Sequence, residues 1–401
     1  MSTTSNLDNS VRGRYLSDYR KAVMARRVYD ILCEPISSDR ETMQRSTSIT
    51  YPYLSSMAIG STAMSETVDI TPQTLRDTTG SISYSSRREA LQDSELLLLQ
   101  SYTDYGQRRF EVLGENMMDT VEAYSLETIL AGYVAFSAAA RSSIDAGTSG
   151  HRLSDTTFAK AKRYMQGLRC PEAPGVAGEG VGGSLLAILH PDAYHDLATG
   201  GNIVSIAQYQ DSSIILNSEL GFLNGFRIIA SPWAKVFYGA GTTATSSIET
   251  TLGAALEALA TSATVASGTN IEDGAWLNIG TEETSTTYYP MNERVRYYSG
   301  ADSTTLTFVG QAENGGVKYD HASGVAVNNN DSVYPVIFGG PKSVAKVFAS
   351  DVGGEFGEVV GPLKQGLAEQ WVSLAWKVYV GYGIPSQNWL CRAEVSSSLD
   401  S

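Results

Sequence analysis

The chain has 401 residues, of which 42% are hydrophobic and 18% charged, and its formal net charge is -14. These values are typical of a folded protein with roughly one to three cores, and they argue against direct nucleic-acid binding, which usually needs a net positive face. No apolar run approaches the ~18 residues of a membrane span, and the longest, Leu96 to Leu99, predicts only a core segment.

The first 45 residues form the basic part of the chain. They hold eight Lys or Arg and six Asp or Glu, a net charge of about +2, which leaves about -16 for the remainder. Residues 12–32 predict a helix closed by Pro35. This basic segment is either an arm that contacts another chain or an ordinary solvated helix. No basic flank precedes an apolar segment at the N-terminus, so we expect no secretory signal.

The three cysteines, Cys33, Cys170 and Cys391, are far apart and odd in number. None belongs to a C-x-x-C pair of the kind that binds a metal or reacts as a dithiol. We therefore expect three reduced, structural thiols in a protein made in the cytoplasm.

Residues 46–90 are rich in Ser and Thr and poor in large apolar residues. Such a segment buries too little surface to fold by itself. Alternating pieces at 47–51 and 80–85 flank it, which predicts a long two-stranded excursion with a polar tip. A disordered linker is the alternative, and a loop of this length in a compact protein is usually functional.

The strongest helical pattern spans 107–140, where Phe110, Leu113, Met117 and Val121 repeat at intervals of three or four residues. A second helix is expected over 155–168, with Ser154 as its N-cap. Shorter elements follow: a buried strand at 184–189, a short helix that Asp192 caps, and a strand within 219–230 after a turn at Asn224-Gly225.

Residues 239–268 consist almost entirely of Gly, Ala, Thr and Ser and predict a domain boundary. From 272 to 333 the pattern is that of strands of about five residues separated by turn residues, which predicts a small antiparallel barrel or sandwich inserted into the chain. A strand is expected at 333–338, a short helix or strand at 342–349, and two long apolar strands at 371–382 and 388–395.

Few residues carry a pattern typical of chemistry. Gly178, Gly180 and Gly183 match G-x-G-x-x-G, but a Pro-rich loop precedes them and a strand follows, the opposite of what a dinucleotide site needs. His190 and His195, with Asp192 and Asp196, are spaced to hold a metal. The simpler interpretation is a capped strand-to-helix turn. No Ser/His/Asp or Cys/His set is linked by local spacing, so we expect no catalytic residue, cofactor or metal, and a protein that is not an enzyme.

Five segments, in order, resemble the major capsid proteins of tailed bacteriophages with the HK97-type fold, most closely the N4-like phage family. They are 113–132 (LGENMMDTVEAYSLETILAG), 185–197 (LLAILHPDAYHDL), 217–234 (NSELGFLNGFRIIASPWA), 333–348 (VYPVIFGGPKSVAKVF) and 370–395 (QWVSLAWKVYVGYGIPSQNWLCRAEV). The resemblance covers most of 46–238 and 333–396, and its specificity lies in the order and spacing of the segments.

The resemblance implies an α+β fold with an inserted all-β domain. The implied parts are an N-terminal arm (1–45), an E-loop (46–95), a P-domain with a spine helix (96–150), the first part of an A-domain (151–238), the β-insertion with a flexible lead-in (239–332), the second part of the A-domain (333–370) and C-terminal P-domain strands (371–401). It also implies a virion protein that assembles in the host cytoplasm as hexamers and pentamers, with portal and scaffolding partners and only weak, non-specific contact with packaged DNA.

Some shells of this fold are locked by an isopeptide bond from an E-loop lysine, but residues 46–100 contain no lysine. Strength is therefore expected from non-covalent overlap or from a separate cementing protein. Because no long, charged helical prefix precedes the arm in this sequence, we expect the scaffold to be a separate protein. Two hypotheses compete with the shell subunit: a surface protein whose β-insertion binds glycans, and an enzyme centred on His190, Asp192 and His195.

Overall fold

The computed structural model describes residues 28–35, 48–59, 72–100, 105–136, 140–170, 185–199, 219–242, 248–281, 291–298, 303–340, 343–348, 357–366 and 370–400. The chain divides into two compact units. Counting only described residues, the first lies within Cys33–Ser125 and Val344–Pro385, and the second lies within Val28–Leu32, Leu126–Ser343 and Ser386–Ser401. The predicted glycine motif at 178–183 and most of the predicted N-terminal helix lie outside the described residues.

The described helices differ from the predicted ones mainly at their ends. They are α3 (Glu95–Gln100), α4 (Tyr105–Leu130), α5 (Asp155–Gly167) and α6 (Pro191–Thr199), with 3-10 turns at Tyr29–Leu32, Arg141–Ser143, Ser149–His151, Gln387–Trp389 and Ser398–Asp400. Pro35 is the last residue of a strand, β1 (Cys33–Pro35), which directly follows the 3-10 turn at Tyr29–Leu32. This turn ends at the residue where the N-terminal helix was predicted to end, and residues 12–27 of that prediction lie outside the described residues. The helix predicted to reach residue 140 ends at Leu130, because β5 (Tyr133–Phe136) pairs in parallel with β19 (Leu390–Val395).

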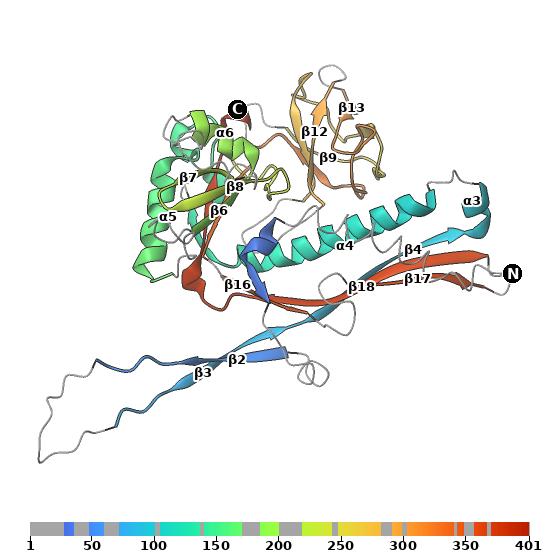
Figure 1. Ribbon diagram of the computed structural model, residues 1–401. Coiled ribbons are helices and arrows are strands. Elements are labelled where there is room, and N and C mark those ends of the chain that lie inside the picture. The colour runs from blue at the N-terminus through green and yellow to red at the C-terminus, as the bar shows by residue number, and fades with distance from the viewer. Residues whose placement is uncertain are drawn as a thin grey trace, which may run out of the picture. The chain divides into compact units, whose positions relative to one another are not determined.

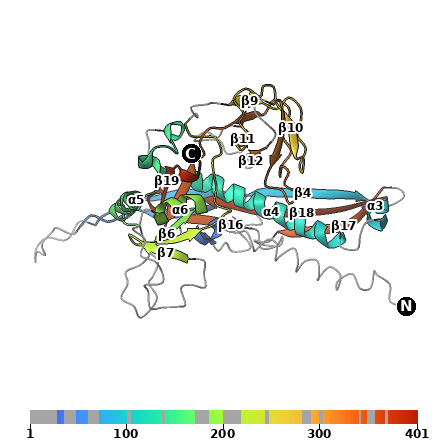
Figure 2. The same cartoon turned by 90° about the horizontal axis from the view of Figure 1, so that it is seen from above.

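The first unit is built on a five-stranded sheet in which β18 (Trp371–Gly383) is central. Along β18 every second side chain from Val372 to Val380 is buried, the alternation expected of a strand with one covered face. Its partners are β4 (Ser85–Ser94), β16 (Val344–Phe348) and β17 (Glu358–Gln365), and β1 extends the sheet beyond β16. Figures 1 and 2 show α4 lying along this sheet. Its apolar stripe, which includes Leu113 and Met117, packs on the buried residues of β18.

A two-stranded ribbon also belongs to the first unit. It consists of β2 (Ser48–Leu54) and β3 (Asp77–Ser83), paired antiparallel from Ser48↔Ser83 to Leu54↔Asp77. This confirms the predicted excursion for the described residues, while the tip at 60–71 lies outside them. Figure 1 shows the ribbon running away from the larger sheet.

The second unit contains a six-stranded sheet in the order β5-β19-β15-β6-β8-β7. The strands not yet given are β6 (Leu185–Leu189), β7 (Glu219–Leu223), β8 (Phe226–Ala230) and β15 (Tyr334–Gly339). Every residue of β15 and β19 is buried. Phe158 of α5 lies edge-on to Phe226 and Phe338 in the core, at 5.8 and 5.1 Å between ring centroids. The predicted turn at Asn224-Gly225 joins β7 to β8, and both residues have positive φ, which glycine and asparagine tolerate best.

The two long C-terminal strands belong to different sheets. The first, β18, lies in the first unit, whereas β19 lies in the second. Likewise β16 lies with β18 rather than with β15. The two units therefore do not follow the boundaries expected at residues 333, 370 and 371. The chain crosses between units after Ser343 and again after Pro385.

The predicted β-insertion is a six-stranded sheet, here called the β-domain (residues 248–331). Its order is β10-β13-β12-β11-β14-β9. The strands are β9 (Glu249–Thr251), β10 (Ser262–Thr264), β11 (Trp276–Ile279), β12 (Glu293–Tyr297), β13 (Thr305–Val309) and β14 (Ala326–Asn328). A bridge between Leu252 and Val265 joins the two edges, which closes a small barrel around its own core. The lead-in predicted to be flexible supplies β9 and β10, so that part of the prediction was wrong.

The segments that enter and leave the β-domain pair with each other. Phe237 and Val333 exchange two backbone hydrogen bonds of 2.9 and 3.0 Å, and Gly241 N donates to Asp331 O at 2.8 Å. The β-domain is thus inserted between β8 and β15 through two adjacent antiparallel segments.

Candidate functional site

The base of the ribbon is fixed tightly to the first unit. Ile49 and Ile82 are buried against Ala345 and Val347 of β16. A Cβ at Gly383 of β18 would lie 2.6 Å from the side chain of Ile82 in β3, so glycine at this position lets β18 and β3 approach closely. The Tyr53 hydroxyl donates a hydrogen bond to the Pro385 carbonyl oxygen.

Beyond this base the arms of the ribbon expose large apolar side chains. Ile59 is 93% exposed and Leu54 is 70% exposed. Met57 and Leu75 are also exposed. The two arms also contact each other beyond the strands. Ser55 N donates to Arg76 O at 2.7 Å, and the side-chain amide of Gln73 accepts a hydrogen bond from Ala58 N and donates one to Ala58 O. Two strands without a covering layer are marginal in water, so this surface is suited to contact with another chain.

A second exposed apolar surface lies at the far end of β4. The helix α3 exposes Leu96, Leu97 and Leu99, and Trp371 at the start of β18 is also exposed. These residues are held in place by Glu95, whose amide donates to Gln370 O at 2.8 Å. A core segment was predicted for Leu96 to Leu99. That prediction was wrong for these three leucines.

The four residues of the predicted metal cluster form two separate pairs. Nδ1 of His190 lies 3.3 Å from the Asp192 carboxylate, and Nδ1 of His195 lies 3.8 Å from that of Asp196. Within the described ranges, no three His, Cys, Asp or Glu side chains are grouped to hold a metal. The helix α6 begins at Pro191, so Asp192 lies inside its first turn and does not cap it.

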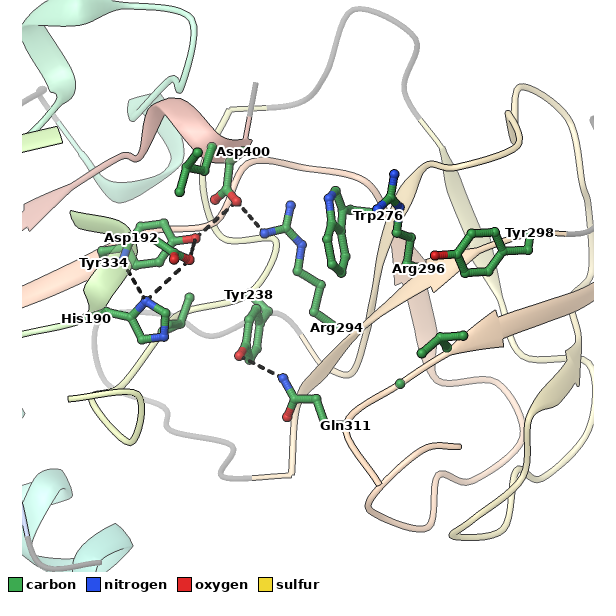
Figure 3. Close-up of a pocket in the computed structure, with 14 residues that line it drawn as sticks. His190, Asp192, Tyr238, Trp276, Arg294, Arg296, Tyr298, Gln311, Tyr334 and Asp400 are labelled. Atoms are coloured by element: carbon green, nitrogen blue, oxygen red, sulfur yellow. Dashed lines mark hydrogen bonds and ion pairs between the residues drawn. The ribbon is translucent and has the colours of Figure 1, made fainter. Parts of the chain in front are cut away.

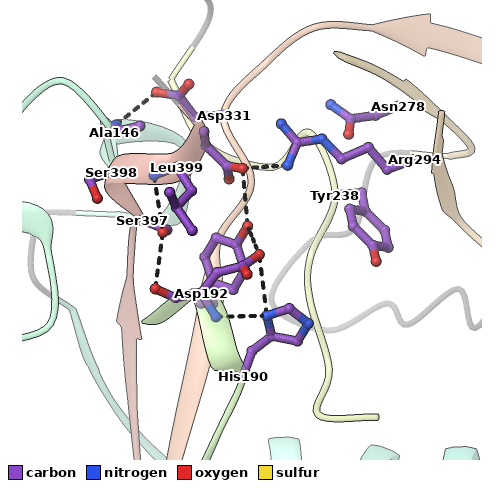
Figure 4. Close-up of polar contacts among 12 residues, drawn as sticks. Ala146, His190, Asp192, Tyr238, Asn278, Arg294, Asp331, Ser397, Ser398 and Leu399 are labelled. Carbon is purple, nitrogen blue, oxygen red and sulfur yellow. Dashed lines mark hydrogen bonds and ion pairs between the residues drawn. The ribbon is translucent and has the colours of Figure 1, made fainter. Parts of the chain in front are cut away.

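Both aspartates instead attach the C-terminal segment to α6, and Figure 4 shows the contact between Ser397 and Asp192. Asp196 accepts hydrogen bonds from the amide and hydroxyl of Ser398, the former at 2.9 Å. The Ser397 hydroxyl donates to the Asp192 carbonyl oxygen at 3.2 Å. The contact with the His190 imidazole lowers the pKa of Asp192, although burial acts in the opposite direction. These residues have a structural role.

Tyr334 connects this corner to the β-domain. Its hydroxyl lies 3.2 Å from the Asp192 carboxylate and 3.1 Å from that of Asp400, which also pairs with Arg294 of β12. Burial, followed by the nearby Asp400 carboxylate, raises the pKa of Tyr334. The phenol therefore stays protonated and can donate between the two carboxylates.

We expect the second unit to lose stability in alkaline solution. Burial raises the pKa of Tyr334 and of Tyr238, and that of Cys391 to about 12. In the unfolded chain these groups ionise at about 10 for Tyr and about 8.5 for Cys. The stability they contribute is complete below those values and is lost as pH rises toward the folded values.

The measurement is the urea midpoint at about pH 8 and about pH 10.5, values on either side of the tyrosine pKa. Tyr334→Phe cannot ionise, so its midpoint should fall less between the two conditions than that of the wild type. An equal fall in both proteins would contradict the assignment to Tyr334. Cys391 should also resist thiol reagents until the chain unfolds, because the thiolate is the reactive form. None of the three cysteines forms a disulfide bond, and all three are buried.

Four side chains that line a cavity were not predicted from the sequence, and they lie on or next to adjacent strands of the β-domain. Arg294, Arg296 and Tyr298 alternate along β12 and its end, and Trp276 of β11 is the register partner of Arg296. They line a cavity of about 570 Å³ together with His190, Asp192, Tyr238 and others, shown in Figure 3. The alternation in Glu293-Arg-Val-Arg-Tyr-Tyr298 was a signal, but the pairing with Trp276 requires the structure.

Among the described residues, no helix has both the length and the apolar character to cross a membrane.

No family model matches the sequence, and no curated protein is similar to it. Solved structures are similar in fold over most of the chain. The capsid of Ralstonia phage GP4 is 10% identical, with 88% of this chain and 84% of that chain covered at a TM-score of 0.52. The capsid asymmetric unit of Cyanophage Pam1 is 10% identical, with 93% of each chain covered at a TM-score of 0.51. The capsid of Cyanophage P-SCSP1u is 10% identical, with 92% and 88% covered at 0.50.

At this level of identity the similarity establishes the fold. The chain has the α+β fold of phage capsid proteins, which confirms the predicted fold class.

Proposed function

We propose that the chain is a major capsid protein that assembles into the icosahedral head shell around a phage double-stranded DNA genome. The observation that carries this proposal is the ribbon, which is anchored at Ile49 and Ile82 but exposes apolar side chains along its arms. A monomer gains nothing from such a ribbon, whereas a neighbouring subunit can cover it. The capsid fold over nearly the full chain supports the same function.

The remaining assignments form part of this proposal. The ribbon belongs to the E-loop (46–95), α4 is the spine helix of the P-domain, the sheet containing β15 is the A-domain, and residues 1–45 are the arm. The subunit associates as hexamers and pentamers with separate portal and scaffolding proteins. It resides in the virion after assembly in the host bacterial cytoplasm, and it has a structural rather than a catalytic role. The five segments that resemble the N4-like family support a relationship to those phages.

The source of shell strength follows from the same ribbon. Since residues 46–100 contain no lysine, an isopeptide bond cannot start from it. We infer that overlap of the ribbon with a neighbour, assisted by a cementing protein where one is present, supplies the strength. The net charge of -14 keeps contact with packaged DNA weak.

The test removes the arms and keeps the base. Residues 55–76 are replaced by Asn-Gly, a two-residue turn that suits the directly paired Leu54 and Asp77. We expect a folded protein that no longer forms shells, tubes or capsomer rings in electron micrographs. A second variant keeps the length and replaces Leu54, Met57, Ile59 and Leu75 by Ser, with the same expected loss.

The matched control replaces two exposed apolar residues of the β-domain, Leu259 and Met291, by Ser. This control should assemble like the wild type. Normal assembly of the Asn-Gly variant would contradict the role of the ribbon. A wild-type protein that stayed monomeric in the presence of its phage partners would contradict the shell function itself.

A further inference from the structure

Two arginines and two aromatic rings form a continuous row at the cavity in the second unit. The guanidinium of Arg294 lies 4.8 Å from the Trp276 ring centroid, and that of Arg296 lies 5.6 Å from the same ring and 5.8 Å from the Tyr298 ring. In Figure 3 the side chains follow one another in the order Arg294, Trp276, Arg296, Tyr298. A guanidinium stacked in this way keeps its N–H edge available in a fixed plane.

The two arginines differ in the groups that their guanidinium N–H donors contact. Arg294 pairs with the Asp400 carboxylate, which Tyr334 also contacts. The side chain of Arg296 is exposed, and across the described part of the chain it makes ring contacts but no hydrogen bond or ion pair. The row thus already holds one carboxylate, from the chain's own C-terminal segment. Arg296 offers the same planar donor edge to a second one.

The rest of the cavity fits a ligand with hydroxyl groups and a flat apolar face. Trp276 is 44% exposed and Tyr298 is 49% exposed despite their contacts with arginine, so ring surface remains for C–H groups of a ligand. Tyr238 and Gln311, joined by a hydrogen bond of 3.2 Å, add an amide and a phenol. A cavity of about 570 Å³ lies in the usual range for small ligands, roughly 300–1,000 Å³. It has room for one or two sugar rings.

The charge of the cavity argues against nucleic acid. Arg294 is neutralised by Asp400, and Asp192 contributes a further negative charge. The Arg296 guanidinium, which has no carboxylate partner among the described residues, matches one carboxylate, whereas a nucleic-acid strand needs several cations along its phosphates.

We propose that the β-domain binds an acidic carbohydrate, a sugar carrying a carboxylate such as a uronic acid, in the cavity between Arg296, Tyr298 and Tyr238. The carboxylate pairs with the N–H edge of Arg296, the ring face contacts Tyr298, and the hydroxyls meet Gln311 and Tyr238. The proposal does not depend on shell assembly, so it can be tested on unassembled full-length protein.

The experiment compares three probes by saturation-transfer NMR and calorimetry: methyl glucuronide, methyl glucoside and acetyl-glutamate amide. We expect saturable binding of the glucuronide and much weaker binding of the other two. Arg296→Gln should weaken glucuronide binding by about tenfold or more, since a charge-assisted paired contact is lost. The glucuronide affinity of Arg296→Lys should lie between those of the wild type and Arg296→Gln, because an ammonium lacks the planar donor edge of a guanidinium. Tyr298→Ala should also weaken binding.

The matched control is Arg163→Gln, which removes an exposed arginine from α5, away from the cavity lining. It should bind the glucuronide like the wild type, and circular dichroism should show that every variant is folded. Equal affinity for glucoside and glucuronide would overturn the role of the carboxylate. Equal affinity for acetyl-glutamate amide would overturn the carbohydrate class. Absence of glucuronide binding, or unchanged binding by folded Arg296→Gln, would overturn the site.

Discussion

Glu394→Ala should destabilise the second unit by about 3–5 kcal/mol, because it leaves two arginines buried without their carboxylate. Glu394 is 0% exposed. It accepts two hydrogen bonds from Arg141, at 2.9 and 2.6 Å, and lies 3.0 Å from Nε of Arg392. Both arginines have further contacts: Arg141 stacks on Phe237 at 3.8 Å, and Arg392 donates to the Leu130 carbonyl oxygen at 2.5 Å. They are therefore held in place and cannot turn toward solvent when the carboxylate is removed.

The control for this prediction is Glu358→Ala, which breaks a pair of similar length at the surface. Glu358 lies 3.0 Å from Nζ of Lys377, and both side chains are exposed. Such pairs contribute about 0–1 kcal/mol. Urea unfolding of the two variants, followed by circular dichroism, should show a large fall in midpoint for Glu394→Ala alone. Similar midpoints would mean that the buried cluster contributes no more than a surface pair.

Trp376→Ala should destabilise the first unit by about 3–5 kcal/mol, the range for truncation of a buried aromatic side chain. Trp376 is among the largest fully buried side chains and packs with Leu113 and Met117 of α4. Its indole N–H donates to Asn116 Oδ1 at 3.0 Å, so truncation also leaves this oxygen without its donor. Trp376→Phe should cost less, because it keeps most of the apolar contact.

Trp371 offers a matched control on the same strand. It lies five residues earlier in β18 and is 46% exposed. Trp371→Ala should change the melting temperature little, while Trp376→Ala should lower it by several degrees. Equal shifts would show that the contact between α4 and β18 is not what stabilises the unit.

The sequence predicted elements well where one periodicity dominated. The alternation along β18, the apolar stripe of α4 and the Asn224-Gly225 turn each determine local structure through spacing alone. Where the predicted secondary structure was wrong, the observed structure depends on pairing with strands that are distant in the sequence. After Leu130 the apolar residues continue, but the chain becomes a strand because β19 is available as its partner. The small residues of 239–268 lack a strand pattern, yet two short strands form there, because β10 pairs with β13 and β9 pairs with β14.

The candidate sites were predicted to different extents. The ribbon was found from its composition, which cannot support an independent fold. The spacing of His190 and Asp192 allowed for their contact, but the contacts of this segment with the C-terminal residues span separations of 205 and 202 positions in the chain. The row from Arg294 to Tyr298 required the register between β11 and β12, which fixes Trp276 opposite Arg296.

The paired segments at Phe237 and Val333 have a consequence for how this chain can change. The chain leaves and rejoins the sheet of the second unit at adjacent backbone positions, so the two ends of the β-domain lie next to each other. Another small domain whose termini lie close together can replace it without stretching β8 or β15. A different small domain can therefore be placed at this position by engineering, while the sheet of the second unit keeps its strand order.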